Sequence, residues 1–121
     1  MEPQPLVRVL VVDDHAAFRA AAVALLEAEG LVVVAEAATA GQATALAEQH
    51  RPDVVVLDIR LPDGDGFSVA EDLARLPHPP AVVLVSSREA SSYGSRLPAP
   101  GSRGFLTKSQ LSGAALLGLL A

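Results

Sequence analysis

Five short apolar runs, separated by helix-like segments, limit the folds open to this chain more than any other feature. The runs fall at 7–12, 31–35, 53–58, 81–85 and 103–107. Runs of this length that are almost wholly apolar are typical of strands covered on both faces. Strands that alternate with helices indicate right-handed βαβ units. The sequence therefore predicts an α/β fold with a parallel five-stranded sheet and helices on both faces.

Four segments carry the signals of helices. The first helix is predicted to end at Gly30, because a glycine commonly follows a helix C-terminus. The second is predicted between Thr39, a suitable N-cap, and about His50, where Pro52 stops it. The third covers about 67–76 and the last 111–120. The side chains expected to face the sheet from the first three are Phe18, Ala22, Leu25 and Leu26, then Ala43, Leu46 and Ala47, then Val69, Leu73 and Leu76.

Two segments read as irregular. The segment 91–102 stands where a fourth helix would follow the fourth strand, yet a glycine inside a helix costs about 1 kcal/mol and a proline about 3. We therefore expect that helix to be short or irregular, with at most two turns. The segment 60–66 is predicted to be a loop, with Asp63 and Asp65 as turn and cap residues. The unfavourable residues of the first segment are Ser91, Ser92, Gly94, Ser95, Pro98 and Pro100.

Size and composition favour one globular domain over 1–121 and exclude several kinds of function. A net charge of −5 argues against binding of nucleic acid through this domain, which needs clustered Lys and Arg. The absence of cysteine excludes disulfides and thiol catalysis, and it is consistent with a cytoplasmic location. The N-terminal residues 1–5 lack the features of a signal peptide, and no apolar stretch approaches the ~20 residues that span a membrane. The three histidines, expected at the surface or in loops, are His15, His50 and His78.

Three aspartates and a lysine lie at the ends of three of the runs. Asp13 and Asp14 follow the first run, Asp58 closes the third, and Lys108, the only lysine, follows the fifth. In neighbouring parallel strands these groups emerge at one edge of the sheet, where open parallel sheets bind ligands. Clustered carboxylates raise one another's pKa unless a cation neutralises them, and an all-oxygen site suits Mg²⁺.

Four motifs of the chain resemble those of response-regulator receiver domains in two-component signalling. In the family's order and spacing they are VLVVDDH at 9–15, VVVLDIRLPDGDG at 54–66, VVLVSS at 82–87 and RGFLTKS at 103–109. The second and fourth are most similar to the subgroup that usually carries a helix-turn-helix output domain. The resemblance implies a flavodoxin-like, doubly wound sheet of strand order 2-1-3-4-5 and a single receiver domain.

The resemblance also implies a phosphoryl-acceptor site that needs Mg²⁺. Asp58 would be the nucleophile that forms an aspartyl phosphate. Asp14, Asp58 and the backbone carbonyl of Arg60 would bind the metal directly, and Asp13 would bind it through a water. Phosphoryl transfer needs little beyond an in-line nucleophile and cations on the phosphoryl oxygens, so these groups are suited to it.

Further residues would respond to the phosphoryl group. Lys108 would pair with its oxygens, Ser86 would donate a hydrogen bond to one of them, and Phe105 would be the switch aromatic that turns inward. A phenylalanine lacks the hydroxyl that tyrosine would offer in the outward position. Arg60 and Arg88 each lie two residues after a site residue, and we expect them to change the lifetime of the phosphoryl group.

The implied function is a phosphorylation-controlled signalling switch, not an enzyme with a separate substrate. A sensor histidine kinase would be the phosphoryl donor, and the domain would catalyse its own phosphoryl transfer and slow dephosphorylation. The last helix is apolar and uncharged, so we expect it to offer a surface for a homodimer or a downstream protein. No second domain is visible after the helix at 111–120.

Two other functions fit part of the pattern. A degenerate receiver would act as an unphosphorylated protein-binding module, and the irregular segment 91–102 together with Phe105 leaves that alternative open. A haloacid-dehalogenase-like phosphatase would share the aspartate nucleophile and Mg²⁺, but it needs a second acid where this chain has Arg60. A dinucleotide site is excluded, since no G-x-G-x-x-G motif follows the first run.

Overall fold

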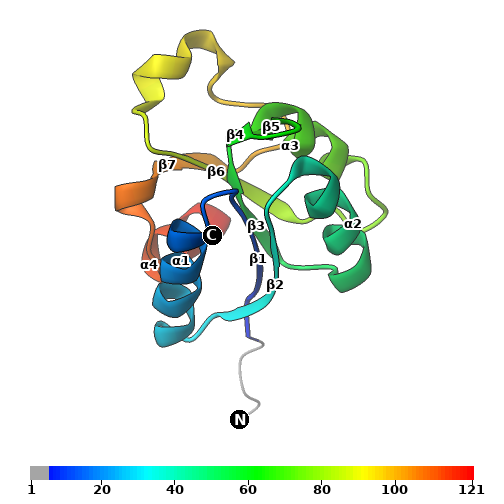
Figure 1. The fold of residues 1–121 in the computed structure, drawn as a ribbon, viewed down its shortest axis with the longest axis vertical. Coiled ribbons are helices and arrows are strands. Elements are labelled where there is room, and N and C mark those ends of the chain that lie inside the picture. The colour runs from blue at the N-terminus through cyan, green and yellow to red at the C-terminus, as the bar shows by residue number, and fades with distance from the viewer. Residues whose placement is uncertain (1–5) are drawn as a thin grey trace.

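A computed structural model describes residues 6–121 and places five strands in one parallel sheet (Figure 1). The order across this sheet is β2-β1-β3-β6-β7, and every pairing within it is parallel. The predicted doubly wound fold with strand order 2-1-3-4-5 is thereby confirmed. The N-terminal residues 1–5, for which we predicted no signal peptide, lie outside the described residues. The strands of this sheet are β1 (Arg8–Val12), β2 (Val32–Ala37), β3 (Val54–Asp58), β6 (Ala81–Ser86) and β7 (Gly104–Thr107).

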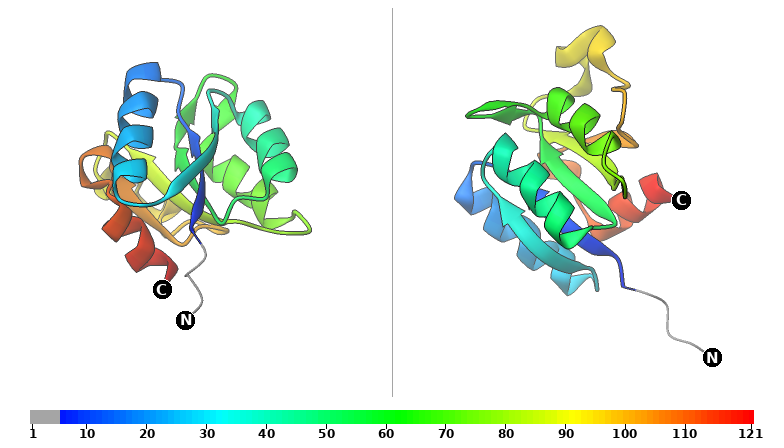
Figure 2. Two further views of the ribbon diagram at one scale, coloured as in Figure 1. Left: turned by 90° about the horizontal axis from the view of Figure 1, so that it is seen from below. Right: turned by 90° about the vertical axis from the view of Figure 1, so that its right-hand side faces the viewer.

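Four α-helices cover the two faces of the sheet, two on each (Figures 1 and 2). Successive side chains of a strand point to opposite faces. In β1, Leu10 and Val12 therefore pack with α2 and α3, whereas Val9 and Val11 pack with α1 and α4. None of the helices in the described part of the chain is long and apolar enough to cross a membrane. The helices are α1 (Ala16–Ala28), α2 (Ala40–His50), α3 (Gly66–Ala74) and α4 (Gly113–Leu120).

The ends of the helices follow the local signals in the sequence. Thr39 caps α2 by accepting a hydrogen bond from the backbone N–H of Gln42 at 3.1 Å, as predicted. Gly30 follows α1 with a φ of 91°, a conformation that glycine adopts without strain. The prediction that Leu25 faces the sheet is wrong, because α1 turns Ala22 and Leu26 inward and leaves Leu25 38% exposed.

The prediction of a plain loop over 60–66 is also wrong, because this segment forms a short antiparallel hairpin. Its strands are β4 (Arg60–Leu61) and β5 (Gly64–Asp65). The predicted turn and cap roles of the two aspartates are confirmed. Asp65 caps α3 by accepting from the N–H of Ser68, and Asp63 accepts from the N–H groups of Ala40 and Gly41 at the start of α2.

We expect Asp63→Ala to lower the melting temperature at pH 7 by a few degrees. The two backbone N–H groups hold the pKa of Asp63 below its ordinary value of 3.8. A carboxyl whose pKa is lowered on folding stabilises the protein above its unfolded pKa, and this stabilisation is lost as the pH falls through the folded pKa. Thermal melts from pH 7 into acid should therefore show the parent and the variant converging. A difference that persists unchanged in acid would contradict this role.

The segment between β6 and β7 contains a short 3₁₀ helix, η1 (Ala90–Arg96). The prediction of a short or irregular fourth helix is thereby confirmed. The helix η1 is interrupted at Gly94, where φ is 53° and ψ is −128°, and none of its residues is buried. Figure 2 shows this segment, in yellow, protruding beyond the end of the sheet. A 3₁₀ turn, η2 (Lys108–Gln110), follows β7, and α4 begins at Gly113, two residues later than predicted.

Candidate functional site

The carboxyl ends of four adjacent strands bring acidic, basic and hydroxyl side chains to one edge of the sheet. Asp13 follows β1, Asp58 ends β3, Ser86 ends β6 and Lys108 follows β7. The side chains of Asp13, Asp58 and Ser86 are almost wholly buried, whereas Asp14 is exposed. The parallel pairing of the strands brings together these groups, which are up to 95 positions apart in the sequence.

Lys108 is the cation at the centre of this group. Its Nζ lies 2.6 Å from Asp13 Oδ2 and 3.5 Å from Asp58 Oδ2. The same ammonium lies 4.5 Å from the centroid of the Phe18 ring, an arrangement in which the face of the ring attracts the cation. Its side chain is only 16% exposed, so water screens these contacts weakly.

Asp13 is held in place by the start of α1. Its Oδ1 accepts a hydrogen bond from the backbone N–H of His15 at 2.8 Å, and Arg19 donates to its carbonyl at 2.6 Å. Within residues 6–121, Asp13 Oδ2 accepts no hydrogen bond and has the Lys108 ammonium as its ion-pair partner. One ammonium is thus shared by two buried carboxylates, so it cannot neutralise both of their negative charges.

This shortage of positive charge affects Asp58 most clearly. Burial raises the pKa of the Asp58 carboxyl above its ordinary value of 3.8, and the charge of Asp13 raises it further. The Lys108 ammonium and the N–H of Arg60, which donates to Asp58 Oδ1 at 3.3 Å, oppose this rise in pKa. A bound divalent cation would stabilise the ionised form of Asp58.

The residues present fit a hard divalent cation. One ligand atom each from Asp13, Asp14, His15 and Asp58 lies within 4.8 Å of the others. Three of the four are carboxylates, the ligands that Mg²⁺ prefers. The buried Asp13 Oδ2, which accepts no hydrogen bond from the described residues, is an oxygen that such an ion would stabilise.

His15 is the residue of this cluster that the sequence analysis overlooked. We predicted a surface histidine, and its side chain is indeed 70% exposed. Its Nδ1 nevertheless lies 3.2 Å from a carboxylate oxygen of Asp13 and 3.2 Å from one of Asp14. The available signal was its position directly after two aspartates at a strand end, just before α1.

Ser86 also has a partner that the sequence analysis missed. Its Oγ accepts from the backbone N–H of Arg88 at 3.0 Å and lies 2.5 Å from the hydroxyl of Tyr93 in η1. The Tyr93 ring packs between Phe67 and Phe105, with centroid distances of 5.9 and 6.0 Å. Tyr93 is the only tyrosine of the chain, and that was the signal available for it.

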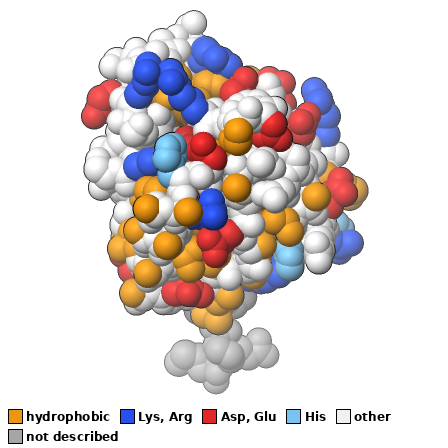
Figure 3. Space-filling view, viewed as in Figure 1, with side chains coloured by type: hydrophobic (Ala, Val, Ile, Leu, Met, Phe, Trp, Pro, Cys, Tyr) orange, Lys and Arg blue, Asp and Glu red, His pale blue; other side chains and the backbone are white. Residues whose placement is uncertain are grey.

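A cavity of about 500 Å³ lies beside this edge, between the β4–β5 hairpin and η1. It is lined by Arg60, Arg88 and Arg96 together with Asp65 and Tyr93. Figure 3 shows basic side chains gathered at this end of the molecule. The two arginines that we expected to influence the phosphoryl group thus lie at the same cavity.

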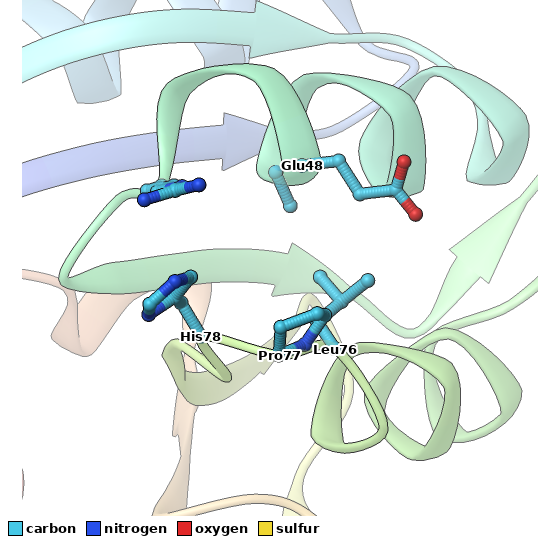
Figure 4. A pocket seen from close by; sticks show the side chains of 6 residues that line it. Glu48, Leu76, Pro77 and His78 are labelled. Atoms are coloured by element: carbon cyan, nitrogen blue, oxygen red, sulfur yellow. The ribbon is translucent and has the colours of Figure 1, made fainter.

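A second cavity of about 340 Å³ lies away from the carboxyl ends of the strands, between the end of α2 and the segment that follows α3 (Figure 4). It is lined by Glu48, Arg51, Pro77 and His78, among others. Figure 4 shows the carboxylate of Glu48 pointing away from the imidazole of His78. The carboxylate cluster at the carboxyl ends of the strands is therefore the stronger candidate for the functional site.

Comparisons with known proteins agree on one family. The family model described as the response regulator receiver domain matches residues 9–117. The chain is 45% identical over 83 residues to the DNA-binding transcriptional activator DevR/DosR of Mycobacterium tuberculosis, a match that covers 67% of this chain and 38% of that protein. It is 35% identical over 104 residues to the response regulator GacA of Pseudomonas aeruginosa, covering 85% of this chain and 49% of that protein.

The structural comparison gives the same result. The signal receiver domain of NarL from Mycobacterium tuberculosis superposes with a TM-score of 0.86 at 34% identity, covering 95% of this chain and 96% of that one. The chain spans about half or less of the length of the curated relatives it matches. The activities of those whole proteins therefore do not transfer directly to this chain.

Proposed function

Because the chain belongs to the family of response-regulator receiver domains, we propose that it is a signalling switch controlled by phosphorylation of Asp58. The observation that carries this proposal is the buried pair of Asp58 and Asp13 with the Lys108 ammonium between them. A sensor histidine kinase is the proposed donor, and a small phosphoryl donor such as acetyl phosphate takes its place in the test tube. The protein then works as a signalling domain rather than an enzyme with a separate substrate.

The proposed chemistry is attack by a carboxylate oxygen of Asp58 on the phosphorus of the donor. A bond forms between that oxygen and phosphorus as the bond to the leaving group breaks, and the leaving group departs with the electrons of that bond, as acetate when the donor is acetyl phosphate. Lys108 neutralises charge on the phosphoryl oxygens, and the Arg60 N–H holds the other carboxylate oxygen in place. Attack by water on phosphorus later returns phosphate and the free carboxylate.

The groups proposed to hold Mg²⁺ are Asp13, Asp14, Asp58 and the backbone carbonyl of Arg60. When bound, the ion supplies positive charge for the phosphoryl oxygens, which is the main requirement of this reaction. The family model and the carboxylate cluster support this assignment. Ser86 is proposed to donate a hydrogen bond to a phosphoryl oxygen, and Phe105, at about 6 Å from Tyr93, remains the proposed switch aromatic.

The proposal is tested by incubating the protein with acetyl phosphate and reading its intact mass. With Mg²⁺ present we expect a gain of one phosphoryl group, and with EDTA in place of Mg²⁺ we expect the rate to fall at least tenfold. The physical reason is that the carboxylates of the site need a divalent cation before a further anion can approach. No gain of mass under either condition would favour the alternative of a degenerate receiver that binds partners without being phosphorylated.

A further inference from the structure

We propose that Tyr93 is a positioning residue for Ser86. In the unphosphorylated protein its hydroxyl holds the Ser86 hydroxyl in a hydrogen bond, and phosphorylation transfers Ser86 to the phosphoryl group and releases η1 from the sheet. This inference rests on the proposed function, because it needs a phosphoryl group on Asp58. In this proposal the Tyr93 hydroxyl, in η1, makes a hydrogen bond that Phe105 cannot make because it has no hydroxyl.

The position of Ser86 makes the transfer feasible. Ser86 directly follows Val85, which is the register partner of Asp58 across the β3–β6 pairing. The carbonyl of Val85 accepts a hydrogen bond from the N–H of Ile59, so the two strand ends are tied together at this point. The Ser86 side chain is almost wholly buried, and its partners are thus limited to protein groups close by or to a group on Asp58.

Ser86 cannot keep its present hydrogen bond to Tyr93 and also donate to a phosphoryl group on Asp58, because a serine hydroxyl has a single proton. Ser86 Oγ has one proton to donate and already accepts from the N–H of Arg88. Phosphoryl oxygens accept hydrogen bonds, so Ser86 must donate that proton to them. If Ser86 is the donor in its bond with Tyr93, phosphorylation breaks the Ser86–Tyr93 bond, because the same proton is then donated to the phosphoryl oxygen. If Tyr93 is the donor, a turn of Oγ toward Asp58 still lengthens the present 2.5 Å contact.

Few other contacts hold η1 to the rest of the protein. None of its residues is buried, and Gly94 interrupts its helical geometry. In residues 6–121, the hydrogen bonds and ion pairs from side chains of η1 to the rest of the chain are the Ser86–Tyr93 bond and the Arg96–Asp65 ion pair at 3.9 Å. An exposed ion pair of that length contributes little. The Arg96 guanidinium also lies 4.0 Å from the centroid of the Phe67 ring. The Ser86–Tyr93 bond is the shortest of these polar contacts, and its loss makes η1 easier to open.

The release of η1 would also change the basic surface next to the site. Tyr93 lines the same cavity as Arg60, Arg88 and Arg96. Movement of the Tyr93 ring away from Ser86 alters the shape of that cavity and the spacing of the guanidinium groups around it. Phosphorylation of the buried Asp58 thereby changes an exposed surface of the protein.

The test uses the fact that Tyr93 is the only tyrosine and that the chain has no tryptophan. Tyrosine labelled with ¹³C at the ring carbon that bears the hydroxyl gives one NMR signal, which responds to hydrogen bonding of that hydroxyl. In the parent protein with Mg²⁺, we expect this signal to shift when acetyl phosphate is added. In Ser86→Ala, the signal before phosphorylation should already be displaced from the parent position, and it should move little afterwards. Ser87→Ala, a change at the exposed neighbouring serine, is the matched control and should behave as the parent.

A second variant separates the hydroxyl from the ring. Tyr93→Phe keeps the packing against Phe67 and Phe105 and removes only the hydrogen bond. Because such a bond holds Ser86 in the unphosphorylated arrangement, we expect phosphorylation by acetyl phosphate to become about two- to tenfold faster. Intact mass is recorded on every sample. A phosphoryl gain with an unmoved tyrosine signal would overturn the role of Tyr93 alone, whereas no phosphoryl gain in the parent would overturn the proposed function as well.

Discussion

An Asp58→Asn variant is expected to lose phosphorylation by acetyl phosphate by at least about a hundredfold. An amide oxygen is a much weaker nucleophile than a carboxylate oxygen, and the amide also removes one of the oxygens proposed to hold Mg²⁺. Intact mass after a fixed incubation measures the effect. The control is Asp72→Asn, since Asp72 is an exposed surface carboxylate whose ion pair with Arg75 contributes little. Uptake at the parental rate by Asp58→Asn would show that another residue is the acceptor.

The same variant is expected to melt at a higher temperature than the parent in buffer without Mg²⁺. The pKa of Asp58 is raised in the folded protein, mainly by burial, so the folded state holds this proton more firmly than the unfolded chain does. As the pH rises from the ordinary value of 3.8 through the raised pKa, the free energy of unfolding falls. At neutral pH the full penalty is present, and asparagine removes it. Stabilisation that is absent at pH 7, or that grows toward acid, would contradict the assigned pKa shift.

Replacement of Lys108 by methionine is expected to lower the free energy of unfolding by about 3 kcal/mol in the absence of Mg²⁺. The change removes the ammonium that lies 2.6 Å from Asp13 and 3.5 Å from Asp58, and it leaves two buried carboxylates without their cation. Methionine keeps a flexible side chain of similar length, so the loss of packing is small. Denaturation by urea with and without Mg²⁺ measures the effect, which should be smaller when the ion is present.

Two matched variants identify the cause of that loss. Lys108→Met combined with Asp13→Asn should recover much of the stability, because the second change removes one of the unneutralised charges. Arg103→Met, at an exposed position in the same motif, should change the free energy of unfolding by no more than about 0.5 kcal/mol. Lys108→Arg should phosphorylate more slowly than the parent, since a planar guanidinium does not replace a compact ammonium. A Lys108→Met variant as stable as the parent would refute the ion pairing.

Local signals in the sequence were sufficient for the main elements and for some of their ends. The apolar run that became β3 is buried on both faces, so its composition alone marked it as an inner strand. Thr39 marked the start of α2 because a threonine side chain caps the backbone three residues on. Leu25 was misplaced because periodicity sets the direction of a side chain only to within a wide arc, and the neighbouring strands decide which part of that arc is covered.

Contacts between distant segments required the tertiary structure. Asp63 was expected as a turn or cap residue, but its partners are the N–H groups at the start of α2, 22 and 23 positions earlier. The pairing of Arg60 with Asp65 in a hairpin is local, but Pro62 and Gly64 between them led to the prediction of a plain loop. The contacts of Asp63 have no local sequence signal, because they depend on where α2 is packed on the sheet.

The sequence by itself determined that strands and helices alternate and that Asp13, Asp58 and Lys108 lie at or just after the ends of three strands, because strand ends follow from hydrophobic pattern and turn chemistry. Only the tertiary structure decided the partners within the site. The sharing of Lys108 by two carboxylates and the bond between Ser86 and Tyr93 depend on the register of parallel strands and on the path of η1. The physical reason is that hydrogen bonds and ion pairs require specific distances in space, which a pattern along the chain does not contain.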